Sequence, residues 1–398
     1  MKFVKQIPRP LTKIDSPKEI VRQFIPSWFA ATMGTGILAV LLHDFPFPFE
    51  HLFDLAWAYW WLNVGLFTIF SIIFLARWAF FFKDALPMFS HPVQSMFLGA
   101  IPMGLSTIVN GVALFCVPVW GPGFVTLAEV LWCINVVLAL ASGLLVPIYM
   151  ISTHEHTLKK MTAVWVLPVV PAEVAAASGG VILPTIANIA FARYIAFLSA
   201  ILWGISVPIA MSILVIFFLR LVLHKLPPND LIISCFLPLG PIGSAALAAT
   251  GLSISAPRIF ASFGDTLSDV AYESLASATP AIGILVACVL WGYGFWWLVL
   301  AVFAVIKTVV DRLPFNLGWW GLIFPLGVFS AATVDLYKLT QLLFFKIAAA
   351  IFICVLFILW WIVMVNTFIR AYTGELFYAP CLHTQMTTVQ AANFELEV

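Results

Sequence analysis

The chain has 398 residues, of which 63% are hydrophobic and only 9% are charged, and its mean hydropathy is +1.07. This balance excludes a soluble globular protein and predicts a polytopic membrane protein. The formal net charge is +1 and the basic residues stand mostly singly, which excludes a nucleic-acid-binding surface. The six cysteines form no CxxC pair, so we expect no disulfide framework, no metal site and no cofactor.

The N-terminal segment carries several basic side chains and no apolar core, so it is not expected to be a cleavable signal peptide. We expect residues 1–24 to form a cytoplasmic arm that includes Lys2, Lys5 and Arg9. Residues 25–375 are expected to form a single transmembrane domain, and residues 376–398 a cytoplasmic tail.

Ten segments are long and apolar enough to cross a bilayer, because about 20 residues span the hydrocarbon core at roughly 1.5 Å per residue. In chain order these predicted spans are 26–43, 56–82, 95–116, 124–152, 163–185, 189–222, 230–254, 279–309, 316–336 and 340–373.

Basic residues gather at or just beyond the ends of the even-numbered spans. They are Arg77, Lys83, Lys159, Lys160, Arg220, Lys225, Lys307 and Arg312. Four basic residues depart from this distribution, namely Arg193, Arg258, Lys338 and Lys346. The positive-inside rule therefore places both termini in the cytoplasm and the protein in the inner (plasma) membrane.

The odd-numbered spans are short and rich in Gly, Pro, Ser and Thr, whereas the even-numbered spans are long and aromatic. Proline inside a helix frees a carbonyl, which in lipid needs a partner. We therefore expect the odd spans to form an inner ring and the even spans a lipid-facing outer ring, in an all-α fold of five helical hairpins.

One short motif recurs about every 70 residues in the odd spans. Its copies begin with Ala31-Thr32-Met33-Gly34, Ile101-Pro102-Met103-Gly104, Leu167-Pro168-Val169-Val170, Leu237-Pro238-Leu239-Gly240 and Phe324-Pro325-Leu326-Gly327. Small residues in a single copy could simply allow close helix packing. Five copies in register instead predict a pseudo-fivefold barrel of kinked helices around a central pore.

Aligned on this motif, residues at steps of three fall on one broad stripe of each helix. If that stripe faces the axis, Phe324 is the natural apolar plug, because an apolar constriction can gate by dewetting. The candidate pore-lining residues are Thr32, Gly34, Ile101, Pro102, Gly104, Thr107, Asn110, Leu167, Pro168, Leu237, Pro238, Gly240, Pro325, Gly327 and Ser330.

Glu173 follows Pro171 within the fifth span, and an ionisable group at that depth is a candidate functional residue. One interpretation is proton coupling, in which Glu173 protonates during transport or repels anions until it does. The other is a neutral carboxyl that is hydrogen-bonded to a freed carbonyl. The sequence leaves both open.

Several stretches resemble the tellurite-resistance/dicarboxylate transporter (TDT) family, which includes plant slow anion channels, yeast malate permeases and fungal sulfite efflux pumps. They are Pro26–Gly36, Ile101–Asn110, Met161–Val170, Leu237–Gly243 and Gly318–Gly327. The resemblance implies ten helices in five hairpins, a homotrimer with one pore per subunit, and a gating phenylalanine at Phe324. Residues 42–48, 91–95, 101–110 and 220–228 look closest to the sulfite-efflux branch, in a compact bacterial-type chain.

The resemblance implies transport of small anions, foremost sulfite or a similar oxyanion. The alternatives are a C4-dicarboxylate (malate) transporter or a tellurite-resistance-type anion channel. No lysine or arginine lies at mid-depth in an odd span, which favours the smaller anion. A membrane-embedded enzyme would need clustered His, Asp or Cys at one depth, which the chain lacks, so we expect no enzyme activity. A purely structural bundle has no reason to repeat proline breaks in alternate spans.

Overall fold

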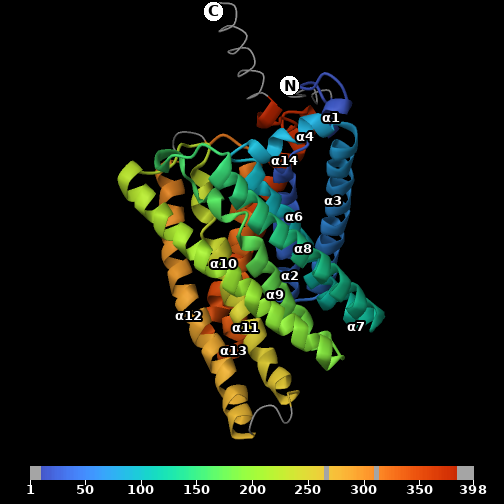
Figure 1. Cartoon of the computed structure of the whole chain (residues 1–398), viewed down its shortest axis with the longest axis vertical. Coiled ribbons are helices and arrows are strands. Elements are labelled where there is room, and N and C mark those ends of the chain that lie inside the picture. The colour runs from blue at the N-terminus through green and yellow to red at the C-terminus, as the bar shows by residue number, and fades with distance from the viewer. Residues whose placement is uncertain (1–9, 264–268, 309–312, 383–398) are drawn as a thin grey trace, which may run out of the picture.

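The computed structural model describes residues 10–263, 269–308 and 313–382. Within these ranges every regular element is helical, which confirms the predicted all-α class (Figure 1). Lys2, Lys5 and Arg9 of the predicted arm, Arg312, and most of the predicted tail lie outside the described residues.

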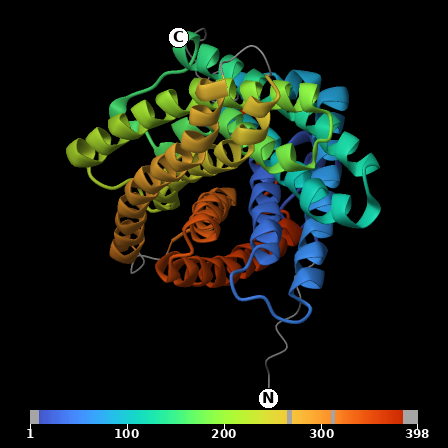
Figure 2. The ribbon, with the colours of Figure 1, turned by 90° about the horizontal axis from the view of Figure 1, so that it is seen from below.

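Five helices are largely buried and contact one another in a closed order. They are α2 (Phe29–His43), α6 (Ala100–Gly111), α9 (Val170–Ile182), α11 (Leu239–Ala261) and α13 (Trp320–Thr340). Each packs against the next along the chain, and α13 packs against α2. Figure 2 looks along the bundle and shows α2 and α13 inside the curve of α14. We call these five the inner helices.

Five longer helices cover this ring. They are α3 (Leu52–Phe80), α8 (Gly123–Ser152), α10 (Ile189–His224), α12 (Asp269–Thr308) and α14 (Leu343–Thr373). Each of these outer helices packs in the groove between its preceding inner helix and the following one. Thus α3 contacts α2 and α6, α8 contacts α6 and α9, and α14 contacts α13 and α2.

Burial separates the two sets as the sequence predicts. In the most apolar window of each outer helix, 22–33% of residues are buried, against 78–89% for the segments that contain α6, α11 and α13. The outer helices therefore expose apolar side chains on most of their surface, as lipid-facing helices do.

Eight described segments meet the length and hydropathy of a membrane span, two fewer than predicted. The two others contain α2, with 15 residues, and α9, with 13 residues. At 1.5 Å per residue neither helix alone crosses a core of about 30 Å. Each is preceded by a separate 3-10 turn, η1 (Pro26–Trp28) or η5 (Ala163–Val166), and η6 (Leu183–Thr185) follows α9.

The remaining elements are short. They are α1 (Lys18–Arg22), α4 (Phe82–Ala85), α5 (Pro87–Ser90), η2 (Ser95–Gly99), the π segment η3 (Val112–Cys116), α7 (Val117–Trp120), η4 (Leu158–Lys160), η7 (Ile232–Phe236) and η10 (Leu317–Trp319). Helices α1 and α4 lie at the same end of the bundle as the residues that follow α14 (Figure 1). We call this the α1 end.

Candidate functional site

Each inner helix is entered through a short 3-10 turn at the α1 end. The five turns are η1, η2, η5, η7 and η10, and they lead into α2, α6, α9, α11 and α13. The motif prolines explain this break in three of the five units. Pro102, Pro168 and Pro238 lie in the first turn of an inner helix or just before it, where the missing N–H costs no hydrogen bond. Pro325 alone lies inside its helix.

The five turns surround a cavity of about 370 Å³. Each turn supplies a wall residue, namely Ser27, Phe97, Val164, Ser234 and Leu317. The residues after α14, including Leu376 and Tyr378, form part of the same wall. The cavity is therefore a vestibule that leads from the α1 end toward the middle of the ring, and we call it the vestibule below.

All five inner helices point their N-termini at this vestibule. A helix N-terminus carries about half a positive charge and unpaired N–H groups. The aligned ends of five helices thus make the vestibule attractive to an anion without a charged side chain.

Charged side chains contribute little to the vestibule. The described residues that line it include no lysine or arginine, and its two acids are Asp230 and Glu375. Glu375 forms ion pairs with Lys13, at 2.7 Å, and with Arg370. The hydrogen bond from Lys13 holds the pKa of Glu375 below its usual value, with further lowering by Arg370, so this carboxylate is ionised and compensated.

The predicted plug, Phe324, lies in the first turns of α13. Gly318 and Gly321 line the vestibule, and Phe324 is the next residue at this spacing of three. Phe324 is 2% exposed and is not among the vestibule residues. Two other residues at the first position of the motif, Leu167 and Leu237, do line it.

Three of the four motif glycines lie where neighbouring inner helices approach each other closely. A Cβ on Gly34 would lie 2.9 Å from Trp320, one on Gly104 would lie 2.4 Å from Thr32 Oγ1, and one on Gly327 would lie 2.6 Å from Ile37. Gly240 has more room, with Pro325 at 3.8 Å. Close helix packing, which the sequence allowed as an alternative, is a role of these glycines.

The polar candidates are buried and mostly bonded within the ring. Thr32 and Ser330 donate to the carbonyls of Phe29 and Leu326, each at 2.7 Å. Thr107 donates to Gly104 O at 2.7 Å and accepts from Asn63 Nδ2 of α3 at 2.9 Å. Ile101 and Asn110 are half-buried, and Asn110 Oδ1 has no hydrogen-bond partner.

Glu173 lies in the first turns of α9 and is fully buried. Neither carboxylate oxygen has a hydrogen-bond partner among the described residues. The adjacent Ser206 hydroxyl of α10 donates to Val169 O at 2.8 Å instead. The Ser206 oxygen can still accept a hydrogen bond while it donates one, so both interpretations of Glu173 stay open.

A repeat that the sequence analysis missed joins the outer helices to the ring. One tryptophan from each outer helix reaches the inner helix of the following unit, and four of them donate an indole N–H to it. The bonds run from Trp132 to Ala175 O (2.8 Å), Trp203 to Ala245 O (3.1 Å), Trp291 to Thr333 Oγ1 (2.9 Å) and Trp360 to Thr35 Oγ1 (3.1 Å). Trp60 lies against Gly111 of α6 without such a bond. The spacing of these tryptophans in the sequence could have revealed the repeat.

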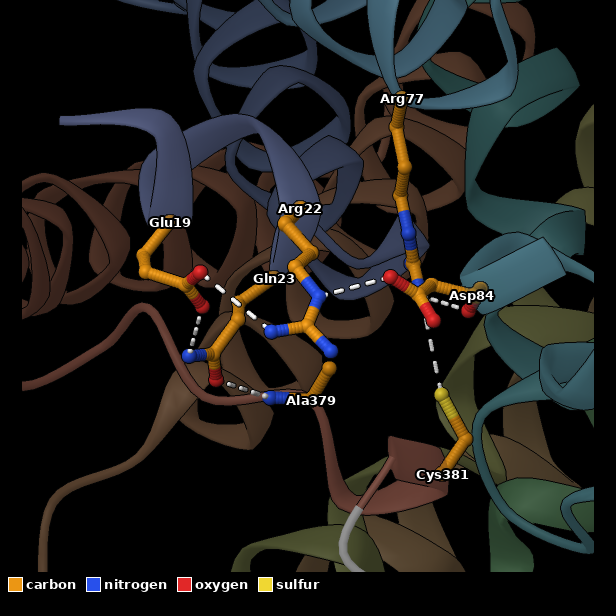
Figure 3. Close-up of polar contacts among 7 residues, drawn as sticks. All are labelled: Glu19, Arg22, Gln23, Arg77, Asp84, Ala379 and Cys381. Carbon is orange, nitrogen blue, oxygen red and sulfur yellow. Dashed lines mark hydrogen bonds and ion pairs between the residues drawn. The ribbon is translucent and has the colours of Figure 1, made fainter. Parts of the chain in front are cut away.

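A polar network at the α1 end holds the residues after α14 beside the vestibule (Figure 3). Arg77 of α3 is fully buried and donates to Phe24 O at 2.7 Å and to Asp84 O at 3.0 Å. It also donates to Cys381 Sγ at 3.7 Å. The Ala379 N–H donates to Gln23 Oε1 at 3.2 Å, so α1, α3 and the C-terminal segment are joined.

Comparison with known proteins agrees with this geometry. A family model described as voltage-dependent anion channel matches residues 23–368. The sulfite efflux pump SSU1 of Arthroderma otae is 38% identical over 357 residues, which cover 90% of this chain and 93% of that protein. An uncharacterized transporter of Methanocaldococcus jannaschii is 28% identical, covering 92% and 99%. The malic acid transport protein of Schizosaccharomyces pombe is 25% identical, covering 88% and 79%. The chain therefore belongs to the voltage-dependent anion channel family.

Proposed function

We propose that this protein moves small anions through the centre of the inner ring, and that its substrate is sulfite or a similar oxyanion that it exports. The observation that carries the proposal is the vestibule, on which five helix N-termini converge. The relatives named as sulfite efflux pumps support the choice of substrate.

Movement of C4-dicarboxylates is the second candidate, because one relative is named as a malic acid transport protein. A dicarboxylate carries two charges on a longer body and would gain from a cationic side chain. The absence of lysine and arginine among the described vestibule residues favours a small, singly charged anion instead. A tellurite-resistance-type anion channel would use the same route.

We infer that ten helices cross the membrane as five hairpins with pseudo-fivefold symmetry, in which α2 and α9 span together with their 3-10 turns. The repeated turns, glycine contacts and tryptophan bonds support this arrangement. The basic residues at the α1 end favour a cytoplasmic vestibule in the plasma membrane with both termini inside. We also infer a homotrimer in which each subunit keeps its own route, to be checked by native mass measurement in detergent.

Phe324 is proposed as the gate of this route, and the motif residues beyond it as its lining. Glu173 is proposed as the group that couples flux to protons, because it is the buried ionisable side chain of α9 and lacks a counterion.

The test is anion flux in proteoliposomes that hold the purified protein. Sulfite, nitrate, chloride and malate are each supplied as a gradient, with and without a pH gradient. We expect sulfite and small anions to move faster than in protein-free vesicles, and malate to move more slowly. Flux of malate alone would assign the protein to dicarboxylate transport, and no flux of any anion would reject the proposal.

A further inference from the structure

Gln94 has an environment that no part of the fold explains. It lies just before η2, is 3% exposed and lines the vestibule. Neither its Oε1 nor its Nε2 has a hydrogen-bond partner within the part of the chain that the structure describes. Buried amides are almost always bonded, and leaving one unpaired is costly because the desolvated group regains no hydrogen bond. A side chain that bears this cost beside a cavity is suited to meet a ligand there.

The backbone around Gln94 is fixed by local hydrogen bonds. The N–H groups of Val93 and Gln94 both donate to His91 Nδ1 at 3.2 Å. Ser95 Oγ donates to His91 O at 2.9 Å. Burial lowers the pKa of His91, which keeps the ring neutral and able to accept these bonds. The backbone from which the Gln94 side chain extends is therefore set before any ligand arrives.

A second unpartnered group lines the same vestibule from another element. Ser234 lies in η7, is 8% exposed, and its hydroxyl has no hydrogen-bond partner. Among the described residues that line the vestibule, Gln94 and Ser234 thus supply a buried, unpartnered amide and a buried, unpartnered hydroxyl, both neutral.

We propose that Gln94 and Ser234 bind a singly protonated oxyanion, one that carries both an O–H and an ionised oxygen, such as hydrogensulfite. This assignment rests on the proposed function and names the form of the substrate. The amide Nε2 donates to the ionised oxygen while Oε1 accepts from the O–H, and the Ser234 hydroxyl donates to a further oxygen.

Anions without an O–H satisfy only part of this site. Nitrate and chloride accept hydrogen bonds but donate none, so Gln94 Oε1 would stay buried and unpaired. Sites with such orphaned groups discriminate strongly against the ligand that cannot pair with them. A doubly ionised oxyanion likewise has no O–H to donate, and it would bring a second charge into a vestibule whose described lining holds no lysine or arginine.

The experiment compares Gln94→Leu and Ser234→Ala with wild type in proteoliposomes, using hydrogensulfite and nitrate as probes. Leucine fills a similar volume without polar atoms, so the fold is expected to persist. Asn366→Leu is the control, since Asn366 is a half-buried amide on the outer helix α14 that is not among the vestibule residues. Thermal stabilisation by each anion gives a readout independent of flux, because a ligand of the folded state raises the unfolding temperature.

For Gln94→Leu we expect the half-saturating concentration of hydrogensulfite to rise about tenfold or more, with a much smaller change for nitrate. Stabilisation by hydrogensulfite should weaken in parallel, and Asn366→Leu should match wild type. If the wild type moves sulfite but Gln94→Leu affects both anions equally, or affects neither, the proposed site is overturned and the proposed function stands. Absence of flux in the wild type would overturn both.

Discussion

At the scale of single residues, Glu173 illustrates which features of the site could be predicted from the sequence and which could not. Its position after Pro171 predicted a buried ionisable group, and it is fully buried with neither oxygen partnered. The sequence could not show that Ser206 would donate to Val169 O rather than to the carboxyl, because that depends on how α10 packs on α9.

Glu173→Gln keeps the size of the side chain and removes its titration. If the carboxyl takes up a proton during transport, wild-type sulfite flux should follow a one-proton step with pH, and the variant should show a flat profile. Flux is measured in proteoliposomes over a pH series with the membrane potential clamped. A variant that keeps both the wild-type rate and the wild-type pH profile would remove Glu173 from the mechanism.

Other candidate residues lie in different surroundings for a geometric reason. Leu167 and Leu237 line the vestibule. Gly34, Gly104 and Gly327 make close contacts with neighbouring inner helices. Aligning the motif copies assumed that each inner segment is one continuous α-helix. A 3-10 turn precedes each inner helix and advances by 120° per residue, which is more than an α-helix does. Side chains before the motif therefore point in other directions than the alignment assumed. Gln94 lies in the stretch 91–95 that resembles the sulfite-efflux branch, but it was not predicted as a site residue because it stands ahead of the repeated motif.

At the scale of elements, the outer helices were predictable because their length and apolar composition mark them directly. The 3-10 turns that precede the inner helices were not predictable. A proline restricts where a helix can begin, but it does not determine the type of turn before that point. The contacts between units also could not be predicted from the sequence, because they join residues that are far apart in the chain, such as Trp132 and Ala175.

Trp132→Phe tests the repeated link between outer and inner helices. The change removes the N–H that Ala175 O accepts and leaves a buried carbonyl unpaired, at a cost of about 1–3 kcal/mol. We expect the unfolding temperature in detergent to fall by roughly 2–4 °C per kcal/mol. Trp61→Phe is the matched control, because Trp61 is 47% exposed on α3. Equal unfolding temperatures for the two variants would contradict a stabilising role for the link.

Gly243→Ala tests whether inner helices α11 and α13 need their close approach. The added Cβ would lie 2.7 Å from the backbone N of Phe329, which cannot move aside as a side chain can. We expect a loss of about 1–3 kcal/mol from overpacking. Gly292→Ala on α12 meets no atom within 4 Å and should instead stabilise by up to about 1 kcal/mol. Urea or thermal unfolding of both variants measures the difference, and a neutral Gly243→Ala would refute tight packing here.

At the scale of the whole molecule, the inner helices close into a ring, the outer helices shield it, and one vestibule opens at the α1 end. The inner/outer division was predicted from composition, and the burial of the segments confirms it. The closed order of contacts could not be predicted from the segments alone, because it depends on how five separate units pack together. In the proposed function the ring and the vestibule give anions a route, and Phe324, which is buried on α13, is the proposed gate of that route.

The proposed gated route is tested most directly by anion flux through Phe324→Ala, measured in proteoliposomes beside wild type and Phe329→Ala. Phe329 is equally buried on α13 but stacks on Trp291 of α12, so its loss costs packing without opening the route. We expect sulfite and nitrate flux through Phe324→Ala to rise at least several-fold over wild type, and flux through Phe329→Ala not to rise. Wild-type rates in Phe324→Ala, or equal increases in both variants, would contradict a gated route through the inner ring.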